Sequence, residues 1–344
     1  MTTRVNSITA LLIFLAFFIA IVFVTLLKKI YYFAFKKKRY YIFPKPSVEG
    51  IANIAMVVAL SVAVLLILTF VTSNAFSVMF RAFPGSRITI EGILIKIGGL
   101  LFGPFIGLFI GALTDLFSIL MTAGIFHYGY FISAMAYGMI SGLIKTIFTM
   151  WKKTKTWYAI ISTIITCLTC FLAIVFLLST FGINDQISQT IIPFKFFPAD
   201  IPVTTFFYIF IGFAGAILAL IWLLYFFSNK FQKMRMMSAN QKHFKVNRPT
   251  KINKEYYCNF CLILMSSVVT ELLINVLLMP SFDADLSTLG YDNWFTIRVA
   301  LFIPMIIFNF VIIYPVYVII SPIVKWDYKV DLIEDSRTPV YVNN

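Results

Sequence analysis

Four ionisable side chains stand in the most apolar part of the sequence, and they are its first candidates for chemistry. Glu91, Lys96, Asp115 and His127 lie between positions 87 and 142, where most other residues are apolar or small. An ionisable group is costly inside a bilayer, so each is by default a candidate for a binding or transport site. Carboxylates accept hydrogen bonds from an organic ligand, and the guanidinium of Arg298, further along the chain, matches a ligand carboxylate bidentately.

The same side chains could instead have structural roles. Lys96 with Asp115, and Arg298 with Glu271, are alternatively ion pairs that neutralise each other in lipid, because buried charges must be paired. His127, in a loop, is more typical of a surface residue than of a ligand group.

A glycine–proline pair divides this apolar stretch into two helices. Residues 88–121 form a run too long for one span, and Gly103-Pro104 stands in the middle of it. Proline fits the first position of a helix, where its missing N–H would be unpaired anyway. The sequence therefore predicts a helix from Ile88 to Phe102, a tight turn, and a second helix from Pro104 to Met121.

The composition is that of a membrane protein. Of the 344 residues, 60% are hydrophobic and only 12% are charged, which no soluble domain of this size shows. We therefore expect an all-α polytopic protein of the cell membrane. The net charge of +14 comes from short basic loops, so it indicates orientation and lipid headgroups rather than nucleic acid. Two C-x-x-C pairs, starting at Cys167 and Cys258, lie at different depths and cannot share a zinc ion, so we predict no metal site and no cofactor.

When residues 88–121 are counted as two helices, the sequence predicts nine spans. They cover residues 8–27, 52–72, 88–102, 104–121, 128–148, 157–179, 203–227, 256–279 and 294–320. With the N-terminus outside, segments 28–51, 149–156, 228–256 and 321–344 face inward and hold 21 of the 28 Lys and Arg residues. This agrees with the positive-inside bias, which a single span over 88–121 would reverse. We expect the basic loop 228–255 to be partly disordered.

This topology gathers polar side chains toward the outer face of the membrane. Asp115 and Lys96 lie roughly 16 and 10 Å above the inner turn at 1.5 Å per residue. Asn74 belongs to an outer loop, 73–86, that could close as a lid. The residues expected in the outer third are Arg87, Glu91, His127, Tyr128, Tyr130 and Arg298. The pattern predicts a polar pocket walled by helices and open to the outside.

The central stretch resembles a known family of transport subunits. Four runs carry the resemblance: R-I-T-I from Arg87, G-G-L-L-F-G-P-F-I-G from Gly98, G-A-L-T-D-L-F from Gly111, and G-I-F-H-Y-G-Y-F-I-S-A from Gly124. They are similar to the folate-family substrate-binding (S) component of energy-coupling factor (ECF) vitamin transporters.

The resemblance covers about half of the chain. It extends to Ala55–Ala63 and to the run T-I-R-V-A-L-F-I-P around Arg298. The chain departs from the family at Leu94, where proline is usual, and at Glu91 and Lys96, where small or apolar residues are usual. These departures leave the identity of the vitamin open.

The resemblance implies a fold with additions to a known core. We expect a six-helix S-component-like core, formed by four helices in 52–149 and two in 257–322. The additions are an extra N-terminal transmembrane helix with a basic inner loop in 1–51, and an inserted transmembrane hairpin with a basic inner loop in 150–256. Residues 323–344 would form a polar inner tail.

The resemblance also implies a function. The chain would bind a vitamin from outside, above all folate or a folate derivative, and deliver it through a transmembrane coupling (T) subunit driven by two ABC ATPase subunits. Family members dock the coupling subunit on a small-residue face, here Ala55, Ala59 and Ala63. A folate-like ligand asks for a carboxylate, stacking aromatics and cations. The candidate substrate-binding residues are Asn74, Arg87, Glu91, Asp115, Tyr128, Tyr130 and Arg298; Trp294 is a further aromatic or an interface anchor.

Alternative functions remain open. The chain could be an S component for another vitamin, such as riboflavin, or a self-contained secondary carrier; an intramembrane enzyme is less favoured. It has no G-x-x-x-x-G-K-[ST] motif with which to use ATP itself. An enzyme needs clustered catalytic groups, and with two histidines we expect no enzymatic activity. Secondary carriers are often inverted repeats, and the sequence shows none by inspection.

Overall fold

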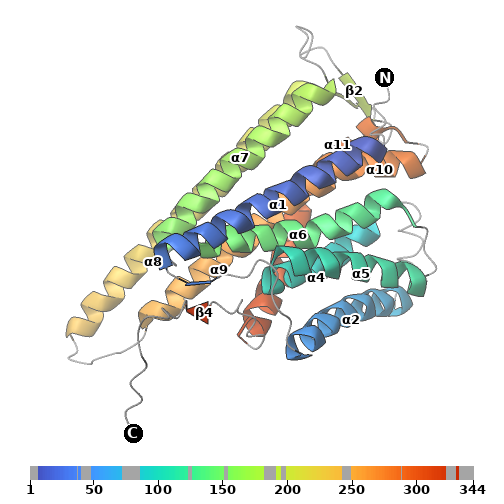
Figure 1. The fold of residues 1–344 in the computed structure, drawn as a ribbon. Helices are drawn as coiled ribbons and strands as arrows, with labels where there is room; N and C mark the ends of the chain where they lie inside the picture. The colour runs from blue at the N-terminus through green and yellow to red at the C-terminus, as the bar shows by residue number, and fades with distance from the viewer. Residues whose placement is uncertain are drawn as a thin grey trace.

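The computed structural model describes residues 7–36, 38–39, 48–71, 86–122, 126–150, 154–181, 191–194, 199–241, 249–287, 289–322 and 331–332 (Figure 1). The α-helices are α1 (Ser7–Lys36), α2 (Val48–Val71), α4 (Ser86–Phe102), α5 (Pro104–Thr122), α6 (Tyr128–Met150), α7 (Lys155–Phe181), α8 (Val203–Gln241), α9 (Pro249–Thr270), α10 (Met279–Leu286) and α11 (Tyr291–Ile320). A π-helix, η2 (Glu271–Leu278), joins α9 to α10. Short strands β1 (Lys38–Arg39) and β4 (Asp331–Leu332) pair antiparallel, as do β2 (Ile191–Phe194) and β3 (Ala199–Pro202).

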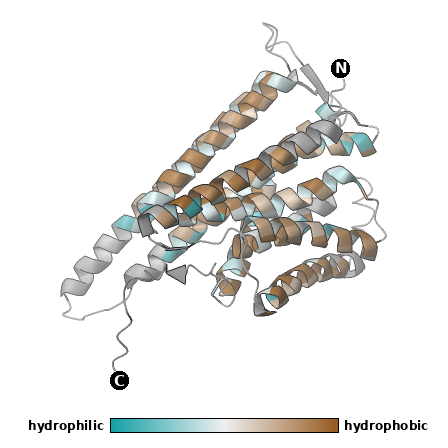
Figure 2. Cartoon of the chain, viewed as in Figure 1, coloured by the Kyte–Doolittle hydropathy of each residue, from teal (hydrophilic) through white to brown (hydrophobic). Residues whose placement is uncertain are grey.

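The chain is an all-α polytopic membrane protein. Within the described residues, six helical segments are long and apolar enough to cross a membrane: Pro104–Met121, Tyr128–Met150, Lys155–Thr180, Val203–Asn229, Glu255–Leu286 and Tyr291–Ile320. A shorter apolar segment, Gly50–Val64, lies in α2. Figure 2 shows hydrophobic residues along most of the length of α5 and α7. Such surfaces suit a hydrocarbon environment, where every backbone polar group must be satisfied within the helix.

The predicted break at the glycine–proline pair is confirmed. Gly103 has a φ of 94°, a conformation that side chains with a Cβ rarely adopt. It separates α4 from α5, and Gly99 and Gly107 meet across the turn at backbone distance. The last carbonyls of α4 are not left unpaired, because the Gly103 N–H donates to Gly99 O (2.9 Å) and Lys145 Nζ donates to Leu101 O (2.7 Å).

Glycines bring α4, α5 and α6 into backbone contact. A Cβ added at Gly99 or Gly107 would overlap the carbonyl oxygen of Gly138 in α6, and one added at Gly138 would overlap the carbonyl of Gly107. Gly142 lies in the same way against the turn at Gly103-Pro104. Small residues allow this close approach between membrane helices, where van der Waals packing replaces the hydrophobic effect. The three helices therefore form a compact scaffold.

The continuous rod α9–η2–α10 is the axis of the bundle. In its apolar 18-residue stretch, 94% of the residues are buried inside the protein, against 17% in the corresponding stretch of α8. α6, α7 and α11 pack around it, and α2 and α1 pack outside the glycine-contact helices. Figure 1 shows α7 and α8 running side by side and diverging from the rest of the bundle.

Two helix ends differ from the sequence-based expectation. α8 does not end near Phe227 but continues to Gln241, and α9 begins at Pro249. The stretch from Ser228 to Gln241 contains no Gly or Pro, so a helix nucleated in the membrane propagates outward. Most of the segment expected to be a disordered loop is therefore helical. At the other end of the rod, the helix continues past Met279 to Leu286.

The glycine contact yields a stability prediction. Gly138→Ala should destabilise the protein by at least about 2 kcal/mol, because the new methyl group forces the α5 and α6 backbones apart. Gly212→Ala is the matched control, since Gly212 lies in α8 with open space around it; that change should leave stability unchanged or raise it by about 0.5–1 kcal/mol. Unfolding of the purified chain in detergent measures both. Equal stability of the two variants would contradict the proposed packing.

Candidate functional site

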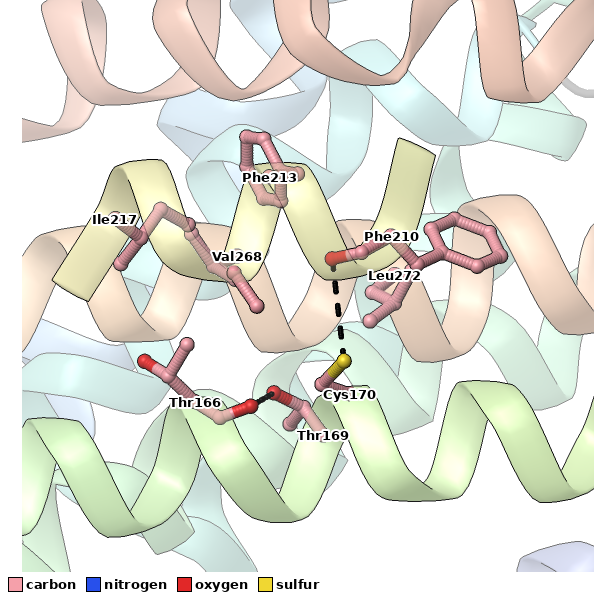
Figure 3. Close-up of a pocket in the computed structure, with 9 residues that line it drawn as sticks. Thr166, Thr169, Cys170, Phe210, Phe213, Ile217, Val268 and Leu272 are labelled. Atoms are coloured by element: carbon pink, nitrogen blue, oxygen red, sulfur yellow. Dashed lines mark hydrogen bonds between the residues drawn. The ribbon is translucent and has the colours of Figure 1, made fainter. Parts of the chain in front are cut away.

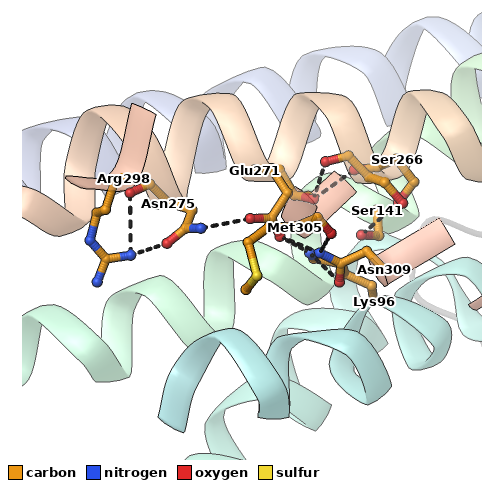
Figure 4. Close-up of polar contacts among 10 residues, drawn as sticks. Lys96, Ser141, Ser266, Glu271, Asn275, Arg298, Met305 and Asn309 are labelled. Atoms are coloured by element: carbon orange, nitrogen blue, oxygen red, sulfur yellow. Dashed lines mark hydrogen bonds and ion pairs between the residues drawn. The ribbon is translucent and has the colours of Figure 1, made fainter. Parts of the chain in front are cut away.

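A chain of polar side chains crosses the buried interior of the bundle. It runs from Lys96 in α4 through Glu271 and Asn275 in η2 to Arg298 in α11 (Figure 4). From Arg298 it continues to Asp283 in α10 and Tyr130 in α6. α11 contributes Arg298 and, near Lys96 and Glu271, Asn309; these two residues are about 16 Å apart along the helix. Polar networks in low dielectric surroundings are stable only when each member is satisfied.

The inner part of this chain is an ion pair enclosed on all sides. Lys96 Nζ lies 2.5 Å from Glu271 Oε1, and both side chains are fully buried. The ammonium also donates to Asn309 Oδ1 (3.2 Å) and lies 4.7 Å from the centre of the Tyr137 ring. Asn309 Nδ2 donates to the same Glu271 oxygen (2.9 Å). The pair is thus neutral and hydrogen-bonded, as a charge inside a membrane protein has to be.

The π-helix orients the carboxylate of this pair. Glu271 and Asn275 both lie in η2, where Asn275 Nδ2 donates to Glu271 Oε2 (2.7 Å). π-Helical turns are rare and occur often at functional sites. Here the wider turn precedes Pro280, which stands in the first turn of α10 and has no N–H to donate. The helix therefore continues past the proline and carries Asp283 into the bundle.

The outer part of the chain is built around Asp283. Its Oδ2 accepts from Arg298 Nε (2.7 Å) and lies 2.5 Å from Arg298 NH2. Its Oδ1 accepts from the Tyr130 hydroxyl (2.7 Å). The NH1 group of Arg298 donates to the side-chain oxygen of Asn275. Residues from α6, α10 and α11 thus meet at one carboxylate.

Aromatic rings lie beside this carboxylate at the end of the bundle. The His127 ring lies 4.6 Å from Tyr128, 5.2 Å from Tyr130 and 5.9 Å from Phe282, measured between centroids. Burial lowers the pKa of His127 below its ordinary value, although the carboxylates of Asp285 and Asp283 act in the opposite direction. The Gly129 N–H donates to its Nδ1 (3.3 Å), a bond that Nδ1 accepts only in the neutral tautomer with its proton on Nε2.

The structure brings together some of the predicted substrate-binding residues. Tyr130 and Arg298 share Asp283, and half-buried Tyr128 lies next to them. Glu91 and Asp115 are buried in α4 and α5, each eleven residues from the helix end that adjoins Gly103 and therefore at similar height, about 16 Å above the turn. Asn74 and the side chain of Arg87 lie outside the described residues.

The predicted ion pairs were wrong in their partners. Lys96 pairs with Glu271 rather than Asp115, and Arg298 pairs with Asp283 rather than Glu271. Asp283 was missed as a site residue because Pro280 was taken as the end of the membrane helix. Glu271 and Asn275, four residues apart in an apolar span, indicate one polar helix face, but this spacing does not indicate a π-helix.

Two aromatic or imidazole residues are also less exposed than expected. Trp294, expected as a further aromatic of the site or as an interface anchor, is 2% exposed, and its Nε1 donates to Ser287 Oγ (2.6 Å). It therefore closes the connection between α10 and α11. His127 is half-buried rather than on the surface.

An apolar pocket lies apart from the polar chain, between α7, α8 and the α9–η2 rod (Figure 3). Its polar atoms are already used: Thr166 and Thr169 donate to carbonyls of their own helix, and Cys170 Sγ donates to Phe210 O (3.9 Å). The remaining lining residues are Phe210, Phe213, Ala214, Ile217, Val268 and Leu272. The cavity is small, about 10 Å³, and its lining offers nothing to a polar ligand.

Comparison with known proteins gives one informative match. The chain is 28% identical over 355 residues to a protein of Mycoplasma pneumoniae described as "Uncharacterized protein MG098 homolog", covering 96% of this chain and 73% of that protein. No protein-family model and no solved structure matches. At this coverage, the matched region spans most of α1 and of the α7–α8 hairpin.

The buried pair predicts a strong dependence of stability on matched charges. Glu271→Leu leaves Lys96 as an unpaired buried cation and should cost about 3–5 kcal/mol of stability, whereas the double change Lys96→Met/Glu271→Leu should cost far less. Unfolding of wild type, the two single variants and the double variant gives the coupling energy. Additive losses in the double variant would show that the two groups do not stabilise each other.

Proposed function

We propose that this protein is the substrate-binding (S) subunit of an ECF-type importer in the cell membrane. It binds a vitamin, in the first place folate or a folate derivative, at the outer end of the bundle. A transmembrane coupling subunit and two ABC ATPases then drive delivery. The observation that carries the proposal is the meeting of Tyr130 and Arg298 on Asp283, because the sequence makes both residues candidates for substrate binding.

The outer cluster has the chemistry that a folate-like ligand requires. It combines a guanidinium and a carboxylate with rings at stacking distance. The half-buried rings of His127 and Tyr128 leave the cluster partly accessible. A site with a few polar groups among aromatic side chains is typical of small-molecule recognition.

A separate face of α2 is available for a membrane partner. Ala55, Ala59 and Ala63 are all exposed, while Val58 and Val62 on the other side are buried against the bundle. In the resembling family this position contacts the coupling subunit. Small side chains would let a partner helix approach closely.

The helix arrangement is compatible with a six-helix core and two additions. In this proposal the core consists of α2, α4, α5, α6, the α9–η2–α10 rod and α11, which pack on one another. The additions are α1, which packs on α6, and the α7–α8 hairpin, which packs on α9. The glycine contacts between α4, α5 and α6 would let the core move as a rigid body when it delivers its ligand.

A self-contained secondary carrier is the second candidate. The observation in its favour is the Lys96–Glu271 pair in the membrane interior, because intramembrane ionisable residues often mark ion or substrate pathways. The two candidates differ in whether the chain transports alone.

A binding experiment tests the first candidate. The full chain in lipid nanodiscs is titrated with folate, 5-formyltetrahydrofolate, riboflavin and thiamin, with binding followed by calorimetry. We expect one folate to bind with a dissociation constant below about 1 μM, equivalent to about 8 kcal/mol, and to be recovered unchanged. Chemical turnover of the ligand would instead indicate an enzyme, and no binding of any vitamin would reject the proposal.

A second experiment tests the partner face and separates transport modes. Ala55→Leu/Ala59→Leu/Ala63→Leu should leave vitamin binding intact but abolish cellular uptake, because the bulkier side chains prevent close helix contact. The matched control is Leu60→Ala on the exposed side of the same helix, which should support uptake. Persistent uptake by the triple-leucine variant would reject the docking face, and counterflow by the purified chain in liposomes would favour the carrier.

A further inference from the structure

Asp283 occupies the position that a ligand's carboxylate would take. Its two oxygens accept from Arg298 and from Tyr130, the guanidinium and the hydroxyl that the proposed function gives to the substrate. Two donors of the guanidinium, Nε and NH2, converge on the same Asp283 oxygen. The third group, Nη1, donates to the side-chain oxygen of Asn275. Arg298 therefore already holds an internal carboxylate.

The two partners are not equally enclosed. The Arg298 side chain retains 9% of its exposure, whereas Asp283 has none. Phe282, the residue before Asp283, is also fully buried, and a Cβ added at Gly129 would overlap its ring. The start of α6 thus closes directly over α10, and of the two partners only the Arg298 side chain retains a small exposure.

The net charge of the Arg298–Asp283 pair determines how strongly a ligand anion is attracted to the site. Arg298 and Asp283 together are neutral, so a second carboxylate gains little attraction while Asp283 remains in place. Two carboxylates at one guanidinium would also repel each other at short range. A ligand carboxylate binds well only if it replaces Asp283.

We propose that Asp283 is a specificity-determining residue, an internal counter-ion that holds Arg298 in the empty protein and is displaced by the carboxylate of the ligand. This inference rests on the proposed function, because it uses the same site. It assigns the ligand to the carboxylate-bearing class. It also explains why the empty site is stable, since an unpaired buried guanidinium would cost several kcal/mol.

The short helix that carries Asp283 is suited to such an exchange. α10 has eight residues, and its last turn is exposed at Asp285 and Leu286. On one side it adjoins the π-helix, and on the other it is joined to α11 through residues 287–290. Only the short helix α10, at the end of the bundle, therefore has to move when Asp283 is displaced. The Lys96–Glu271 pair stays in place.

The test compares two ligands that share a ring system. Folate carries carboxylates and 6-methylpterin carries none. In the full chain in nanodiscs, Asp283→Asn should bind folate at least about tenfold more tightly than wild type, equivalent to about 1.4 kcal/mol, because the competitor is removed. Its affinity for 6-methylpterin should change less than about twofold. Unchanged or weaker folate binding by Asp283→Asn, or an equal gain for both ligands, would overturn the inference.

Two further variants keep the result interpretable. Asp292→Asn removes the same charge at an exposed position on α11, and it should change neither affinity by more than about twofold. The uncharged pair Asp283→Asn/Arg298→Gln contains no unpaired buried charge, so it should fold even where Asp283→Asn does not. It should bind folate no better than 6-methylpterin, and a retained preference for folate would overturn the inference.

The inference and the proposed function fail in distinguishable ways. If wild type binds folate and Asp283→Asn binds it more weakly, the inference falls and the proposed function stands. If wild type binds no vitamin, the proposed function falls, and glutarate with its uncharged diamide glutaramide become the probes. Saturable thermal stabilisation of Asp283→Asn by glutarate alone, as ligand linkage requires, would support the inference, and no stabilisation would overturn it.

Discussion

A charge inside a membrane protein must be neutralised where it stands, and this constraint determines how the helices of this protein are arranged. The Lys96–Glu271 pair joins α4 to the central rod, and the Arg298–Asp283 pair joins α11 to the end of the same rod. Removing one member of such a pair costs more than removing both. The two ion pairs therefore fix the rod, α4 and α11 relative to one another. α7 and α8, by contrast, pack on each other and on α9 mainly through apolar side chains.

The glycine contacts supply the geometry that this charge pairing needs. α4 reaches the rod only because α4, α5 and α6 pack backbone to backbone, and the positive φ of Gly103 allows α4 and α5 to lie against each other. This part of the fold could be predicted from the sequence, because a Gly-Pro break and glycines at spacings of four are local signals with local consequences. The apolar spans could be predicted for the same reason.

The ion-pair partners in the site could not be predicted, because they depend on two features of the central rod: the π-helix η2 and the continuation of the helix past Pro280. Pro280 reads as the end of a span, but η2 shifts the hydrogen-bonding register before it, and the helix continues to Leu286. Asp283 is thereby carried into the bundle rather than left in an outer loop. With Asp283 inside, Arg298 has a closer partner than Glu271, which leaves Glu271 for Lys96. Because the end of this helix was predicted at the wrong residue, both ion pairs were predicted with the wrong partners. Tyr130 and Arg298 were nevertheless predicted at the same end of the bundle, where both lie.

Lys96 belongs to the scaffold rather than to the proposed ligand site. The Lys96 ammonium contacts Glu271, Asn309 and the face of Tyr137, and a ligand could compete for it only by leaving Glu271 as an unpaired buried charge. At the outer end the situation is reversed, because the Arg298 side chain keeps some exposure and its counter-ion lies on a short helix with an exposed last turn. Of the two buried pairs, only the outer one can exchange its anion at moderate cost. Selectivity for the ligand should therefore reside in Asp283 and its neighbours, while the inner pair holds the helices in place.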